Sequence, residues 1–110
     1  MHANLSHQRI DRINAAQDRH IAAKLRREHA PLRVARENLR RWMARDGRKV
    51  RAVFREWHCI LTRLSRDEIA DFLLSETPMA RRLQQSSPFA GVLSDSERAA
   101  IRQRHAKTRR

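Results

Sequence analysis

The chain has 110 residues, of which 25 are Lys or Arg and 12 are Asp or Glu, so its formal net charge is +13. This length limits the chain to one small domain, and its two glycines, three prolines and lack of tyrosine favour helices over a sheet. The only cysteine, Cys59, excludes an intramolecular disulfide, and no apolar run approaches the roughly 20 residues of a membrane span.

The first predicted element is a long helix over residues 6–29, with Ser6 as its N-cap. Its apolar stripe is narrow and contains mainly alanine and a few larger residues, Ile10, Ile13, Ile21 and Leu25. Such a helix packs lightly on the domain or pairs with a second copy of itself, so a homodimer is one alternative. The residues before it lack the apolar region of a signal peptide, and we expect a cytoplasmic, bacterial protein.

A helical hairpin over residues 31–64 is expected to form the centre of the core. Ala30-Pro31 separates it from the first helix, and Asp46-Gly47 forms the turn between a helix at 31–45 and a helix at 48–64. The second of these has the strongest helical periodicity in the chain, with apolar residues at 50, 53, 54, 57, 60, 61 and 64. We expect the two helices to pack through Trp42, Met43, Phe54 and Trp57.

Two capping boxes predict helices in the last third of the chain. Ser65 with Glu68 begins a helix at 66–75, and Ser94 with Glu97 begins a helix at 95–106. Between them, Pro78 opens a short helix at 78–85 with Met79 and Leu83 facing inward, and Phe89 should return to the core from a loop. Residues 107–110 are expected to be a disordered basic tail. The predicted fold is therefore an all-α, single-domain bundle of five or six helices over residues 1–106.

The positive charge is unevenly distributed along the chain. The net charge is +7 over residues 31–63, −3 over residues 64–97 and +6 over residues 98–110. Arg33, Arg36 and Arg40 share one side of a helix, where like charges repel each other unless a polyanion relieves the repulsion. We expect this face and its extension to contact phosphates; the residues are Arg33, Arg36, Arg40, Arg41, Arg45, Arg48 and Lys49. A solvated face in an Arg-rich proteome is the alternative interpretation of this arginine pattern.

The C-terminal end offers a second set of cations. There is no acidic residue among the last 13, and Arg102 lies among six basic residues there. These residues could assist phosphate binding as an electrostatic arm, or they could simply solubilise the terminus. Aromatic residues are few and are needed in the core, so base stacking on single strands is not expected.

The segment at 65–85 resembles a bacterial helix-turn-helix motif in its opening sequence, SRDEIADFL. The resemblance implies base-edge contacts from the second helix, whose candidates include Arg81 and Arg82 as well as Gln84 and Gln85. The segment departs from the motif where Leu74 and Ser75 replace the turn glycine, and it is net acidic. Both departures count against the motif, whereas the arginine face and the basic C-terminal end favour backbone contact over base reading.

Catalytic and metal sites are not readable in this sequence. The six histidines show no metal-ligand spacing, and no nucleophile–base pair or phosphate-binding loop is present, so we expect neither catalytic residues, nor a cofactor, nor a bound metal. Cys59 is interpreted as a structural cysteine beneath the first helix, with a reactive exposed thiol as the alternative.

The sequence predicts a small basic, non-enzymatic accessory protein that binds nucleic acid, with DNA favoured, through phosphate contacts. The alternative is an adaptor or inhibitor that docks its basic face on an acidic protein. A membrane surface is not an expected partner, because the first helix lacks a large aromatic face.

Overall fold

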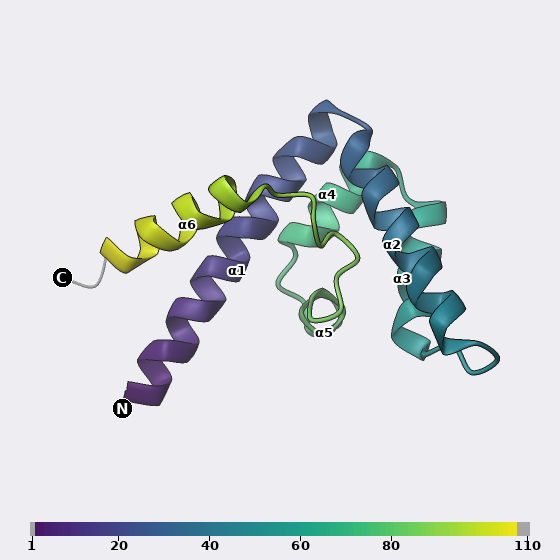
Figure 1. Ribbon diagram of the computed structural model, residues 1–110, viewed down its shortest axis with the longest axis horizontal. Helices are drawn as coiled ribbons and strands as arrows, with labels where there is room; N and C mark the ends of the chain where they lie inside the picture. The colour runs from purple at the N-terminus through teal and green to yellow at the C-terminus, as the bar shows by residue number, and fades with distance from the viewer. Residues whose placement is uncertain (1, 108–110) are drawn as a thin grey trace.

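The computed structural model describes residues 2–107 of the chain, and side chains over residues 7–106. This part contains six α-helices and no strand (Figure 1). The helices are α1 (His2–Arg27), α2 (Ala30–Asp46), α3 (Ala52–Arg63), α4 (Arg66–Leu74), α5 (Pro78–Gln84) and α6 (Asp95–Lys107). The predicted all-α fold is confirmed.

Helices α2 and α3 form the expected antiparallel hairpin (Figure 1). Pro31 lies in the first turn of α2, and Gly47 follows its last residue with a φ of 66°, a conformation that glycine adopts without steric cost. The rings of Trp42 and Phe54 pack across the hairpin with centroids 5.6 Å apart. The prediction that α3 begins at residue 48 is wrong. The Asp46 carboxylate accepts a hydrogen bond from the backbone N–H of Arg51 at 3.0 Å and holds residues 47–51 as a loop.

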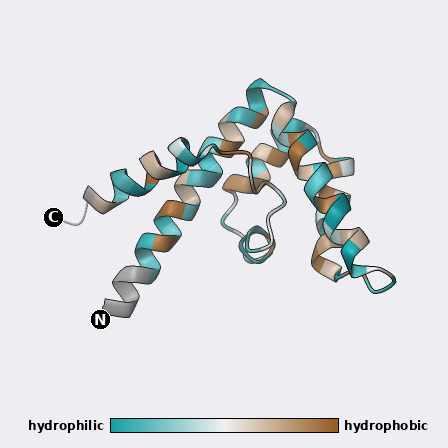
Figure 2. Ribbon diagram, viewed as in Figure 1, coloured by the Kyte–Doolittle hydropathy of each residue, from teal (hydrophilic) through white to brown (hydrophobic). Residues whose placement is uncertain are grey.

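Trp57 connects α3 to three other parts of the molecule. Its side chain is fully buried, and its ring makes edge contacts with Phe72 of α4 and Phe89 of the loop after α5, at 5.6 and 6.2 Å. Its indole N–H donates to the carbonyl oxygen of Leu83 in α5 at 2.9 Å. The return of Phe89 to the core is therefore confirmed. Figure 2 shows that hydrophobic and hydrophilic residues alternate along the helices, as expected of helices with one buried face.

The loop after α5 is also anchored to α2. The amide of Asn38, a buried polar side chain, donates to the carbonyl oxygens of Pro88 and Ala90 at 2.9 and 2.8 Å. A buried amide with partners costs little, whereas the same amide without them would destabilise the fold. Asn38 therefore holds the loop against α2.

Helix α1 packs mainly along α4, and its N-terminal part extends beyond the rest of the core (Figure 1). Leu25 and Ile21 are buried, Ile13 is half-buried, and Ile10 is 52% exposed. The apolar stripe of α1 is thus fully buried against the domain only over the C-terminal half of the helix. The helix begins at His2, so the prediction of Ser6 as its N-cap is wrong, and it ends at Arg27 instead of residue 29.

Both predicted capping boxes are present. The Ser65 hydroxyl accepts from the Glu68 N–H at 3.1 Å, and the Glu68 carboxylate accepts from the Ser65 N–H at 2.8 Å. Ser94 and Glu97 make the same reciprocal pair at 3.1 and 2.8 Å. These bonds satisfy backbone donors that the first turn of a helix leaves without partners, which explains why α4 and α6 begin where the sequence indicates.

The orientation of α5 differs in part from the prediction. Leu83 is buried as expected, but Met79 is 49% exposed. Thr77 caps the helix by accepting from the Ala80 N–H, and only the line through Ala80 and Leu83 faces the core of this seven-residue helix. Met79 is rotated about 100° from Ala80 and therefore points to solvent.

At the C-terminal end, helix α6 includes Lys107, which was predicted to belong to the disordered tail. The rest of that prediction concerns residues 108–110, which lie outside the described residues.

Candidate nucleic-acid interface

The predicted arginine face of α2 is divided by its contacts. Arg40 pairs with Glu37 through two hydrogen bonds of 3.1 and 2.5 Å, which hold the pKa of that carboxyl below its usual range. Arg36 donates to the carbonyl oxygen of Leu61 at 3.2 Å. Of the three, only Arg33 has a side chain without a hydrogen bond or ion pair among the described residues. One of the three charges is already neutralised, so this face is a weaker polyanion site than its spacing indicates.

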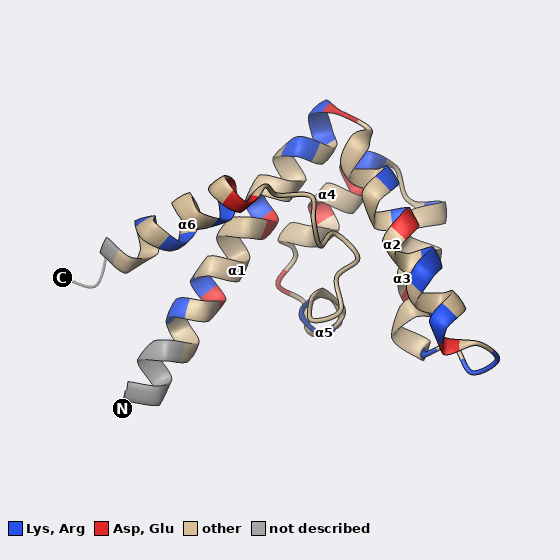
Figure 3. Cartoon of the chain, viewed as in Figure 1, with Lys and Arg blue, Asp and Glu red and all other residues tan. Residues whose placement is uncertain are grey.

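The connection between α2 and α3 carries a denser group of unpartnered cations. Arg45, Arg48 and Lys49 are exposed and have no hydrogen bond from their side chains and no ion pair within residues 7–106. We call these three residues the hairpin end. The reversal at Gly47 allows three cations to project within a stretch of five residues. Figure 3 shows the blue, basic loop at this end of the hairpin, with one red, acidic position beside it.

Asp46 is the only acidic residue between Arg41 and Arg55, and it does not screen the hairpin end. Its side chain is 10% exposed, because its carboxylate faces the backbone N–H of Arg51 at 3.0 Å and the Arg51 Nε at 3.4 Å. The Arg51 guanidinium also lies over the Phe54 ring, 5.2 Å from its centroid. The carboxylate is thus used to fix the loop, and the outward surface remains cationic.

Arg41 completes the positive surface on α2. Its guanidinium donates to the side-chain oxygen of Asn38, a neutral group. The hydrogen bond orients the arginine without cancelling its charge. Arg41 can therefore contribute to the same electrostatic field as the hairpin end.

The predicted base-reading residues of α5 are held by intramolecular contacts. Arg82 forms two hydrogen bonds of 3.0 and 2.8 Å with Glu56 of α3, and these lower the pKa of that carboxyl. Arg81 pairs with Glu76 at 3.2 Å, and Gln84 donates to the carbonyl oxygen of Leu73 at 2.7 Å. Among the four candidate residues, this leaves only Gln85 without such a contact. Contacts of this kind stabilise the domain and oppose a base-reading role.

Arg102 lies on the exposed side of α6. Like Arg104, it has no hydrogen bond from its side chain and no ion pair in the described part of the chain, whereas Arg98 is hydrogen-bonded to Asp95. The structure therefore places Arg102 outside the hairpin and separates it from the other predicted contacts.

The prediction that Cys59 lies beneath α1 is wrong, because the side chain is exposed. Helix α1 packs on α4 instead of on this side of α3. Over residues 7–106, no group of three or more His, Cys, Asp or Glu side chains is placed to hold a metal ion. Among the described helices, none combines the length and the apolar character that crossing a bilayer requires.

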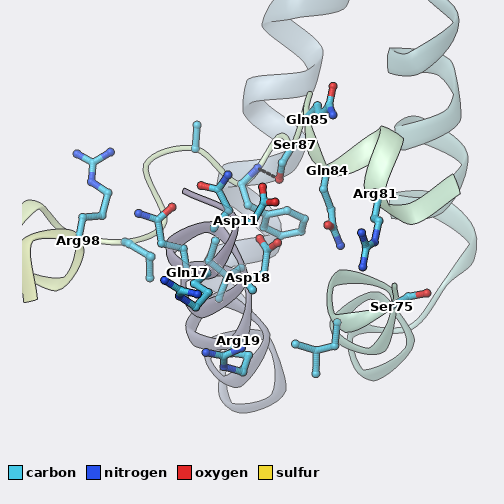
Figure 4. A pocket seen from close by; sticks show the side chains of 18 of the residues that line it. Asp11, Gln17, Asp18, Arg19, Ser75, Arg81, Gln84, Gln85, Ser87 and Arg98 are labelled. Carbon is cyan, nitrogen blue, oxygen red and sulfur yellow. Dashed lines mark hydrogen bonds between the residues drawn. The ribbon is translucent and has the colours of Figure 1, made fainter. Parts of the chain in front are cut away.

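A groove that sequence reasoning missed lies between α1, α5 and the following loop (Figure 4). Its volume is about 1140 Å³, and its lining combines both signs of charge, including Arg19, Arg81, Asp11 and Asp18. The side chain of Asp18 is half-buried and makes no hydrogen bond or ion pair with any described residue, and burial raises its pKa to about 6. In the sequence, Asp18 is one polar residue among many on a helix, and only the position of Ile21 one turn later indicates that this side faces inward.

Comparison with models of protein families, with curated proteins and with solved structures found no match to this chain.

Proposed function

We propose that this protein binds nucleic acid, with DNA the favoured form, through phosphate contacts from the hairpin end. The observation that supports the proposal is the set of three exposed cations, Arg45, Arg48 and Lys49, that have no partner within the described residues. The nearest acidic side chain, Asp46, is turned inward. Arg33 and Arg41 extend the same field along α2.

The physical basis is counterion release. Duplex DNA carries a condensed layer of cations, and each phosphate neutralised by a protein side chain releases part of that layer. An unpartnered arginine contributes its full charge to this exchange, whereas Arg40 would first have to leave Glu37. Because Arg81, Arg82 and Gln84 are held within the molecule, the contacts proposed here are with the backbone and carry little sequence specificity.

The test is binding of the purified protein to a random-sequence duplex between about 50 and 200 mM salt. The Arg45/Arg48/Lys49→Gln variant should bind more weakly, and the slope of log affinity against log salt should fall by about 2–3, since each phosphate contact contributes roughly 0.9. The matched control is Arg12/Arg19/Arg27→Gln, which removes the same charge from exposed positions of α1 that make no described ion pair. Equal losses in the two variants would contradict the hairpin end as the binding surface.

An acidic protein is the second candidate partner. Leu74 and Met79, at the ends of the connection between α4 and α5, are 44% and 49% exposed, and exposed apolar side chains of this size are typical of protein interfaces. If the partner is an acidic protein, we expect no duplex binding at about 50 mM salt. The affinity of the protein complex should depend only weakly on salt, and Met79→Ser should lower that affinity.

A further inference from the structure

Two groups of unpartnered cations lie at opposite ends of the molecule. The hairpin end is at one end of the longest axis, and the C-terminal half of α6 is at the other (Figures 1 and 3). The extent of the molecule along this axis is 48 Å. Arg102 and Arg104 are exposed on α6 and make no ion pair with the described residues, as is true of the hairpin end.

Helix α6 is held in its outward position by contacts with α1. Lys24 of α1 donates to the Glu97 carboxylate at 2.9 Å and to the carbonyl oxygen of Val92 at 3.3 Å. His20 lies 3.1 Å from the other oxygen of Glu97, and Ile101 is buried. The first two turns of α6 are therefore docked on the domain, and Arg102 and Arg104 follow where the helix extends away from it (Figure 1).

Outside the two ends, several cations are held in ion pairs, whereas Arg12, Arg19, Arg27 and Arg33 are exposed and make no ion pair with the described residues. Arg82 pairs with Glu56, Arg81 with Glu76, Lys24 with Glu97, and Arg26 with both Asp67 and Asp71. At physiological ionic strength, electrostatic interactions between exposed charges decay over about 8 Å. The two ends of the 48 Å axis are several such lengths apart, so the charges of one end add little to the potential at the other, and we treat the ends as separate sites.

We propose that the hairpin end and the outer half of α6 bind two different nucleic-acid segments, so that one protein molecule bridges two duplexes. This inference depends on the proposed function. A duplex is stiff over about 150 base pairs, so it cannot bend around a body of this size without a large cost. Two sites at opposite ends of a 48 Å axis are therefore better matched to two duplexes than to one.

The first experiment measures stoichiometry with a 12-base-pair random duplex at about 50 mM salt, by native mass spectrometry and sedimentation. The wild-type protein should bind two duplexes per monomer. The matched variants Arg45/Arg48→Gln and Arg102/Arg104→Gln each remove two unpartnered arginines, and each should bind only one. A duplex that runs along the molecule and contacts both ends would instead give one duplex per wild-type monomer.

The second experiment measures bridging directly. Beads carrying one duplex should retain a second, labelled duplex when wild-type protein is added, and either variant should reduce retention to the background level. If no duplex binds at all, the proposed function fails. If one duplex binds and only Arg45/Arg48→Gln abolishes it, the proposed function stands and bridging is overturned. Retention that persists with Arg102/Arg104→Gln would also overturn the bridging role of α6.

Discussion

Asp18 illustrates how the environment of one residue changes its chemistry. A carboxylate in water is stabilised by solvent, but Asp18 is half-buried beside the groove and has no partner among the described residues. Burial disfavours the charged form and raises its pKa from 3.8 to about 6. At pH values between 3.8 and about 6, the Asp18 carboxyl is more often protonated in the folded protein than in the unfolded chain. The destabilising effect of this carboxyl is thus absent below pH about 4 and complete above pH about 6.

We therefore expect Asp18→Asn to stabilise the protein at neutral pH. At pH 7.5 the free energy of unfolding should rise by about 1–2 kcal/mol, less than the full pKa shift implies because the site is partly open to solvent. At pH 4 the variant and the wild type should be equally stable. Urea unfolding at both pH values measures the difference, and Asp11→Asn, at an exposed position two turns earlier, is the control. A gain of the same size at both pH values would contradict burial as its cause.

At the level of helices, the sequence predicts which elements exist better than it predicts where they end or what they touch. Local signals, such as the capping boxes at Ser65 and Ser94 and the apolar period through Trp57, correctly place six helices, because each depends on residues within a few turns. The start of α3 was misplaced because one side chain, that of Asp46, captures a backbone N–H five residues later. The pairing of Arg82 with Glu56 joins residues 26 positions apart, so it could not be read from helix periodicity.

Helix α6 allows capping and docking to be separated experimentally. Glu97 serves both, since it accepts from the Ser94 N–H and from Lys24. The hydrogen bond from the Ser94 backbone and the contact with Lys24 lower its pKa to about 2. A carboxyl with a lowered pKa stabilises the folded state above pH about 4.5, and this contribution is lost as the pH falls towards 2.

The variant Glu97→Gln keeps the acceptor needed for capping but loses the charge that Lys24 and His20 contact. In the wild type, the protection of the α6 amides from hydrogen exchange should therefore fall as the pH is lowered from 5 to 2.5. In the variant, this protection should be lower than in the wild type at pH 5 and should not change with pH. Ser94→Ala should instead lower the stability of α6 by about 1 kcal/mol at every pH. If Glu97→Gln kept the pH dependence of the wild type, another group would have to hold α6 on α1.

At the scale of the whole molecule, the arrangement of helices decides which predicted residues can act as a site. Sequence reasoning identified the cations of the hairpin end, but it did not separate them from Arg40 and Arg82. The i,i+3 spacing of Glu37 and Arg40 is a local signal for their pair, whereas Glu56 reaches Arg82 only in the folded arrangement. Nor could it place the C-terminal half of α6 at the opposite end of the molecule, and it preferred a buried Cys59 over the exposed alternative that the structure shows. Composition sets the total charge, and packing decides which part of that charge remains available.

The same packing makes Trp57 the side chain on which the stability of the whole domain should depend most. It joins α3 to α4, α5 and the loop at Phe89, and its indole N–H donates to the Leu83 carbonyl oxygen, which also accepts from the Ser86 N–H. Trp57→Phe leaves a cavity and removes one hydrogen bond from the Leu83 carbonyl, which keeps the Ser86 N–H at 3.0 Å, and should lower the free energy of unfolding by about 2 kcal/mol. Trp42→Phe, at a half-buried position with one ring neighbour, should cost about 1 kcal/mol or less. Urea unfolding followed by circular dichroism measures both variants.

Because one core joins all these elements, Trp57→Phe should shift a single unfolding transition without dividing it. Two separate transitions would show that the hairpin unfolds independently of α1 and α4.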